Sequence, residues 1–100
     1  MAEYNLLVWS DPMPGRDDEY NEWYNNVHAK DICSLPGITG IQRFVFSNIM
    51  PMPRKYLAIY GVETDDPDGF FDKFAAGATG FEISPALDAA NAMMSLVKKI

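Results

Sequence analysis

The sequence predicts an α+β fold with element order βαββαβ, in which both helices cover one face of an antiparallel sheet. Two observations lead to this prediction. Short apolar segments alternate with segments in which apolar residues recur every three or four positions. Clusters of proline and glycine separate these segments, and no internal repeat or linker divides the chain. A chain of 100 residues has the length of one domain, which we expect to span residues 1–100.

The first strand is predicted at residues 4–10, where a short apolar run stops before the two prolines of Asp11-Pro12-Met13-Pro14-Gly15. A helix follows, because Asp17 and Asp18 can cap its first turn and Pro36-Gly37 can end it. The residues at helical spacing within it are Tyr20, Trp23, Tyr24, Val27, His28, Asp31, Ile32 and Leu35.

The middle of the chain predicts two further strands. Residues 38–49 alternate, with Ile41, Arg43 and Val45 on one side and Phe44 and Phe46 on the other. Residues 56–63 are apolar on both faces and end before Asp65-Asp66-Pro67-Asp68. Proline-rich residues 50–53 separate the two strands.

The last third predicts a helix and a strand. A short helix begins near Pro67 or Asp68, carries three phenylalanines and is lost between Gly77 and Gly80. Residues 84–91 allow one more helical turn. Residues 93–100 suit helix or strand by propensity, and their length and their place after a helix favour a fourth strand. This order of elements is the split βαβ, or ferredoxin-like, arrangement.

One face of the predicted sheet has no helices on it. The strands at residues 38–49 and 56–63 nevertheless carry apolar residues on both faces, so the uncovered face would present a large apolar patch to water. We expect a second copy of the chain to cover it, sheet against sheet, in a twofold homodimer.

Composition and charge exclude several classes of partner. Eight Lys and Arg against fourteen Asp and Glu give a net charge of −6, which disfavours nucleic acid and anionic membrane surfaces. A single cysteine, Cys33, and a single histidine, His28, leave no intrachain disulfide and no metal site of paired thiolates or imidazoles. No signal peptide or membrane span is visible, and we expect a cytoplasmic protein.

His28 is the first candidate for chemistry. It lies on the apolar stripe of the first predicted helix, away from the polar face that carries Glu22, Asn25 and Asn26, so we expect its imidazole to point toward the sheet. The ordinary pKa of histidine, about 6.5, suits both the uptake and the release of a proton near neutral pH. The alternative is a neutral core histidine that is hydrogen-bonded to backbone.

Tyr24 and Asn5 are candidates for contact with a substrate. Tyr24 shares the stripe of His28 and could orient a substrate oxygen, although packing is the commoner role of a buried tyrosine. Asn5 alternates with Leu7 and Trp9 in the first strand. If that side faces the helices, the Asn5 amide lies in the same crevice as His28; otherwise Asn5 is an exposed residue at the start of a strand.

Arg43 lies among apolar neighbours in the second strand. It either anchors an anionic group of a substrate or pairs with Asp31 or another carboxylate, and the ion pair is favoured. Aromatic residues that could line an apolar pocket, and that could equally be core, are Trp9, Trp23, Phe46 and Phe81.

Three segments carry a resemblance to a known family. They are Trp23-Tyr24-Asn25-Asn26-Val27-His28, Leu35-Pro36-Gly37-Ile38 and Gln42-Arg43-Phe44. Together they resemble the signature of EthD-type members of the dimeric α+β barrel superfamily; the second half of the chain is similar only in element order. The resemblance implies a ferredoxin-like protomer that pairs sheet to sheet, with His28 at the mouth of a cavity between helix and sheet. Members include polyketide cyclases and dehydratases, cofactor-free monooxygenases and haem-handling enzymes, so no single reaction is implied.

From these observations we expect a small cofactor-independent enzyme of the lyase, dehydratase, cyclase or isomerase type. His28 would act as general acid and base on a hydrophobic, aromatic or polyketide-like small molecule. A haem- or oxygen-using protein of the monooxygenase kind, with His28 as axial ligand, is the first alternative. A non-catalytic dimer that binds a small ligand or supports a partner enzyme is the second. Motifs of nucleotide-binding loops, zinc proteases and serine hydrolases are absent from the sequence.

Overall fold

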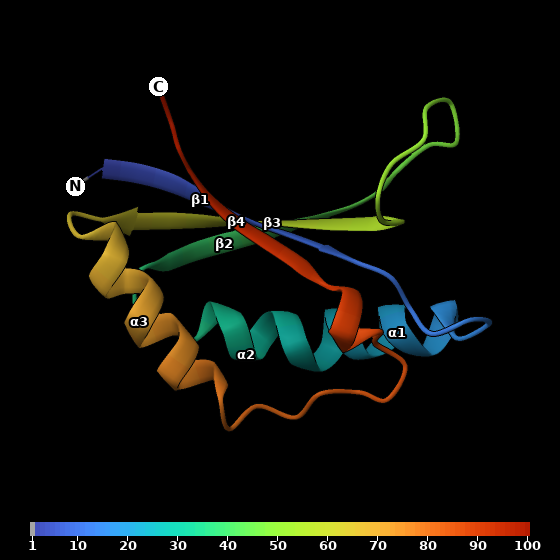
Figure 1. The fold of residues 1–100 in the computed structure, drawn as a ribbon. Helices are drawn as coiled ribbons and strands as arrows, with labels where there is room; N and C mark the ends of the chain where they lie inside the picture. Colours follow the sequence, from blue (N-terminus) through green and yellow to red (C-terminus); the bar gives the residue numbers. More distant parts are fainter. Residues whose placement is uncertain (1) are drawn as a thin grey trace.

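The computed structural model describes residues 2–100 and confirms the predicted α+β fold. Four strands form one antiparallel sheet in the order β2-β3-β1-β4. The strands are β1 (Ala2–Ser10), β2 (Ile38–Val45), β3 (Tyr56–Thr64) and β4 (Met93–Lys98). The helices lie on one side of this sheet, and no helix of the described residues covers the other (Figure 1). This is the ferredoxin-like arrangement.

The first predicted helix is present, with a change of winding in its middle. It consists of α1 (Asp17–Trp23), a π-helical turn η1 (Tyr24–His28) and α2 (Ala29–Cys33). Capping by Asp17 or Asp18 is a wrong prediction, because Arg16 occupies the cap position and no side chain caps the helix. Both carboxylates lie in the first turn, where the positive end of the helix dipole favours them.

The second helix, α3 (Pro67–Ala78), begins where its sequence predicts. The Asp66 side chain accepts a hydrogen bond of 3.1 Å from the backbone N–H of Gly69, and Pro67 occupies the first turn. A 3₁₀ turn, η2 (Ala89–Asn91), supplies the extra turn before β4. None of the helices among the described residues is long and apolar enough to cross a bilayer.

The second strand is shorter than predicted. β2 ends at Val45 instead of residue 49, because residues 46–55 form a loop that projects away from the helical layer (Figure 1). A backbone hydrogen bond of 3.0 Å from Phe46 to Lys55 closes the base of this loop. Prolines 51 and 53 cannot donate to a strand ladder, which explains the early end.

The pairing of the strands decides which side chains meet the helices. Leu6 pairs with Tyr60, and both are fully buried under the helices. Neighbours in each strand point the other way. We call this second side the open face; it carries Asn5, Leu7, Trp9, Phe44, Leu57, Ile59, Met93 and Val97.

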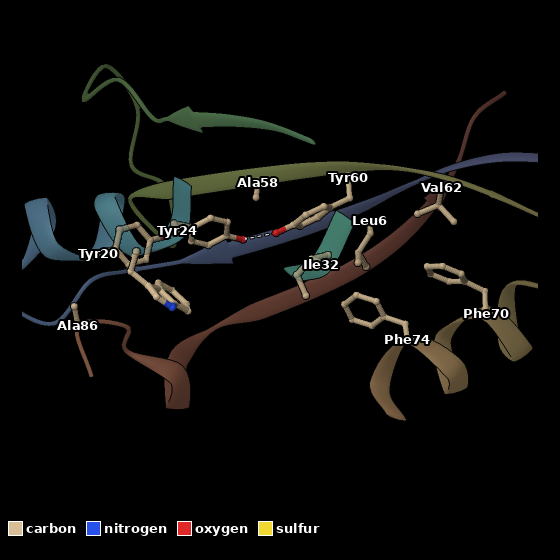
Figure 2. Packing of buried hydrophobic residues seen from close by; sticks show 11 residues of the cluster. Leu6, Tyr20, Tyr24, Ile32, Ala58, Tyr60, Val62, Phe70, Phe74 and Ala86 are labelled. Carbon is tan, nitrogen blue, oxygen red and sulfur yellow. Dashed lines mark hydrogen bonds between the residues drawn. The ribbon is translucent and has the colours of Figure 1, made fainter. Parts of the chain in front are cut away.

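The core between sheet and helices is unusually rich in tyrosine. Figure 2 shows the hydroxyl groups of Tyr24 and Tyr60 pointing at each other, 3.0 Å apart. Tyr20 is buried beside them and its hydroxyl lies 2.6 Å from Ser10 Oγ. Each buried hydroxyl therefore has a partner, as an apolar interior requires.

Candidate functional site

His28 is the last residue of the π-helical turn and lies half-buried against two aromatic rings. Its imidazole stacks on Trp23, with ring centres 4.6 Å apart and planes at 23°. It meets Tyr24 edge to face at 4.9 Å. The Nδ1 atom is buried and has no hydrogen-bond partner within residues 2–100. The sequence left open that His28 is a core histidine hydrogen-bonded to backbone. Its Nδ1 atom makes no such bond.

The π-helical turn explains how one imidazole contacts two successive aromatic residues. In an α-helix, with 3.6 residues per turn, Tyr24 lies one turn from His28 and Trp23 lies on a different side. A π-helical turn repeats at i to i+5, which brings Trp23 to the side of His28 as well. Such turns occur frequently at functional sites.

Burial sets the charge of His28. Desolvation lowers the pKa of the imidazole, the carboxylate of Asp31 opposes this shift, and the cation of Arg43 adds to it. The ring is therefore neutral at pH 7, the form that accepts a proton or binds a metal ion.

Residues 81 and 82, in the segment between α3 and β4, hold Trp23 in position beside His28. The Trp23 indole Nε1 donates a hydrogen bond of 3.2 Å to the backbone carbonyl of Glu82. Phe81, the preceding residue, packs partly buried against the core. Trp23 thus contacts His28 and Phe81 packs against the core, and their part in lining a pocket stays a prediction.

Arg43 corrects a prediction. It forms no ion pair with Asp31 or with any other carboxylate of the described residues, so the favoured reading of the sequence is wrong. Its guanidinium instead donates to Asn21 Oδ1 and Asn25 Oδ1, each at 2.9 Å. It also lies 4.2 Å from the centre of the Tyr24 ring. The reason is register, because β2 places Arg43 beneath α1 and η1 rather than beneath α2.

Three other predicted residues lie away from His28. Asn5 and Trp9 are on the open face, because Leu6 between them faces the helices. The condition under which the Asn5 amide would share a crevice with His28 is therefore not met. Phe46 lies at the base of the 46–55 loop, where it lines a hollow of about 520 Å³ with other loop residues.

Sequence reasoning missed the polar partners of Arg43, namely Asn21, Asn25 and Tyr56. These three line a hollow of about 340 Å³ together with Arg43, Phe44 and Val45. A signal existed, because Asn21 and Asn25 are four residues apart and so share one helix face. Of the five hollows described on residues 2–100, none has His28 in its lining.

Similar proteins are found by structure alone: no protein-family model and no curated protein matches this chain. A protein from Shewanella loihica PV-4 that is provisionally described as a monooxygenase has a TM-score of 0.69 at 12% identity, over 99% of this chain and 95% of that one. The haem degrader MhuD from Mycobacterium tuberculosis has a TM-score of 0.68 at 16% identity, over 97% and 95% of the two chains.

MhuD corrects the expectation that this chain works without a cofactor. Its structure holds two haems in the active site, and a mutant of it holds two manganese protoporphyrin IX molecules per active site. A structural neighbour of this chain thus holds porphyrins, and this finding contradicts the prediction of a cofactor-free protein.

A third neighbour bears on the resemblance noted in the sequence. An ethyl tert-butyl ether D (EthD) family protein from Bacillus halodurans C-125 has a TM-score of 0.63 at 13% identity, and the match covers 100% of both chains. The shared architecture is the four-stranded antiparallel sheet with helices on one side. The EthD-like, ferredoxin-like fold that the three sequence segments imply is the fold of this chain.

Proposed function

We propose that the protein binds a hydrophobic small molecule next to His28 and uses this imidazole as a general base and acid for proton transfer. The observation that carries the proposal is the buried Nδ1 atom without a partner on a ring that is neutral at pH 7. Leaving a buried polar atom unpaired costs about 1–3 kcal/mol. Such a cost is often found where a site needs the atom for chemistry.

The surroundings of His28 suit an aromatic or polyketide-like substrate. The Trp23 and Tyr24 rings fix the imidazole from two directions. Flat aromatic walls favour flat ligands. Reactions of the lyase, dehydratase, cyclase and isomerase types all need a proton to be moved, and one histidine can first take it up and then return it.

The exchange of a carbon-bound proton for deuterium tests this proposal directly. We would incubate the protein with 2-tetralone, an aromatic ketone, in D₂O and follow the exchange beside the carbonyl by NMR. We expect His28→Gln to lose about 100-fold of the protein-dependent rate, a typical contribution of a general base. Lys30→Gln, a change at an exposed residue of α2, is the control. Equal rates in wild type and a folded His28→Gln variant would refute the role of His28.

A second candidate function is porphyrin binding, which the two MhuD structures favour. The residues fit in donor chemistry, because haem iron takes a neutral imidazole as axial ligand and His28 has one. His28 would hold the iron, and a bound haem would supply redox chemistry with oxygen. Haem titration checks this: a shift of the Soret band on binding that is absent with His28→Ala supports it, and an unchanged spectrum of free haem with the wild type contradicts it.

We propose further that the working unit is a homodimer. Phe44, Met93 and Val97 on the open face are 46%, 41% and 40% exposed, and apolar side chains also occupy its centre. A second copy of the chain is the simplest cover for this face. Light scattering should give a dimer for the wild type and a monomer for Ile59→Glu, whereas Ala76→Glu on the exposed side of α3 should stay dimeric.

A further inference from the structure

Arg43 is hydrogen-bonded to neutral amides, whereas several other cations of the protein are paired with carboxylates. Arg16, Lys55 and Lys99 pair with carboxylates. Arg43 pairs with none among residues 2–100, although the chain holds fourteen Asp and Glu. Two of its five N–H groups are used, both on amide oxygens. The charge is held in place and is not neutralised.

The groups around Arg43 fix its position. Rings of Tyr24, Tyr20 and Tyr56 lie 4.2, 5.4 and 5.8 Å from the guanidinium carbon, which allows cation–π attraction. Asn21 accepts from Arg43 and donates through Nδ2 to the Tyr56 hydroxyl at 3.2 Å. A cation held in this way loses little side-chain entropy when it binds a ligand.

The network continues from Tyr56 to an ion pair. The Tyr56 hydroxyl donates to Asp17 Oδ2 at 3.0 Å, and Lys55 Nζ contacts the same oxygen. These two hydrogen bonds, that of Lys55 first, lower the pKa of Asp17. The Asp17 carboxylate is thus bonded to Lys55 and Tyr56 and forms no ion pair with Arg43.

The hollow beside Arg43 has two kinds of wall. Asn21, Asn25 and Tyr56 are polar, and the Asn25 Nδ2 atom donates to no described residue. Phe44 and Val45 are apolar, and Val45, on the same face of β2 as Arg43, is 60% exposed. A volume of about 340 Å³ lies in the range of small-molecule sites.

We propose that this hollow binds an aromatic carboxylate. Arg43 and the amide of Asn25 hold the carboxylate, and the ring lies against Val45, which is on the same face of β2 as Arg43. A guanidinium matches a carboxylate in both charge and shape. A lone inorganic phosphate fits less well, because part of the wall is apolar and a phosphate has no apolar part to place against it. The proposal does not depend on proton transfer by His28.

Binding can be read at His28, because Tyr24 contacts both residues. The Tyr24 ring centre is 4.2 Å from the Arg43 guanidinium and 4.9 Å from the His28 ring centre. Arg43 and Asp31 are the charged groups that act on the imidazole. A carboxylate on Arg43 offsets its charge and raises the pKa of His28. With one histidine in the chain, a single imidazole signal reports this shift by NMR.

The experiment titrates the full chain with benzoate, with neutral benzamide and with inorganic phosphate, and follows binding by calorimetry and by the His28 signal. We expect benzoate to bind at least about tenfold more tightly than benzamide or phosphate. Arg43→Gln should lose this preference, and Asn25→Ala should weaken benzoate binding several-fold. Lys30→Gln makes the same change of net charge away from the hollow and should bind as the wild type does.

Three results would overturn the proposal: no binding of benzoate, equal binding of benzoate and benzamide, or an unchanged benzoate affinity in Arg43→Gln. If phosphate binds and benzoate does not, the site takes a phosphate-like anion and the aromatic carboxylate is wrong. If Arg43→Gln fails to fold, the exposed Asn25→Ala decides the matter, because an unchanged benzoate affinity there contradicts the role of its amide. The exchange reaction tests proton transfer by His28 and benzoate binding does not, so either proposal can fail without the other.

Discussion

The hydroxyl groups of Tyr24 and Tyr60 form a hydrogen-bonded pair inside the core. Removal of one hydroxyl leaves the other buried without a partner. Burial raises the pKa of Tyr24 to about 12 and raises that of Tyr60 as well. Both hydroxyls therefore stay protonated at neutral pH. Each satisfies the other at 3.0 Å.

Substitution of Tyr60 by Phe should destabilise the protein by about 1–3 kcal/mol, because it leaves the Tyr24 hydroxyl buried without a partner. The double variant Tyr24→Phe/Tyr60→Phe removes both hydroxyls and should be close to wild type. Urea unfolding of the two single variants and the double variant measures this. If the double variant loses the sum of the single effects, the hydroxyl pair is not the cause.

His28 makes stability depend on pH in a predictable direction. Its pKa is lowered in the folded protein and about 6.5 in the unfolded chain, so the unfolded chain binds the proton first as the pH falls. The free energy of unfolding should therefore fall as the pH drops through about 6.5, until the folded-state pKa is reached.

Urea unfolding between about pH 7.5 and about pH 5 checks the contribution of this one group, with His28→Gln as reference. Carboxylates titrate alike in both proteins and cancel in the comparison. The wild type should lose more stability over this range than the variant. Parallel pH profiles would mean that burial does not hold the imidazole neutral.

At the scale of elements, Gly37 is the last residue of the short connection between α2, which ends at Cys33, and β2, which begins at Ile38. It has φ of +89°, and a Cβ there would lie 3.1 Å from two ring carbons of Phe70. Gly15, in the loop before α1, has φ of +75° and nothing within 4 Å of the position of a Cβ. An alanine at position 15 would therefore meet backbone strain alone, whereas an alanine at position 37 would meet both backbone strain and a steric clash with Phe70.

We expect Gly15→Ala to cost about 1–2 kcal/mol, the strain of a left-handed backbone alone. Gly37→Ala should cost more, because the strain is joined by a contact with a buried ring that cannot easily move. Thermal or urea unfolding of both variants measures the difference. Equal losses would show that the Phe70 ring moves aside freely.

The helix from Asp17 to Cys33 shows what the sequence pattern can and cannot reveal. Apolar residues at helical spacing predict its existence and its stripe. The π-helical turn at Tyr24–His28 was not predicted, because one inserted residue leaves the mixture of three- and four-residue spacings intact. The contact of Trp23 with His28 therefore came only from the structure.

At the scale of the whole molecule, the order of helices and strands along the chain and the single helical layer followed from pattern and punctuation, whereas the placement of single residues did not. β1 and β3 carry apolar residues on both faces, so alternation alone could not tell that Leu6 faces the helices and Asn5 does not. The partners of Arg43 depend on which turn of the helix lies over it in the folded protein, and the local sequence pattern does not reveal this.

The proposed dimer has a consequence for thermal unfolding. If two chains share the open face, the transition temperature Tm should rise with protein concentration, since unfolding then also separates the subunits. Calorimetry over a hundredfold concentration range, on the order of micromolar to tenths of millimolar, measures this. Ile59→Glu should unfold at one Tm at all concentrations. A constant Tm in the wild type contradicts a dimer that dissociates on unfolding.

The stacking of Trp23 on His28 also has an optical consequence. Indole emission is quenched by a protonated imidazole in contact with it, and Trp23 lies 4.6 Å from the only imidazole of the chain. Trp9, the other indole, lies on the opposite side of the sheet. A chain with Trp9→Phe would thus carry a single fluorophore whose brightness reports the protonation of His28, with no external dye attached.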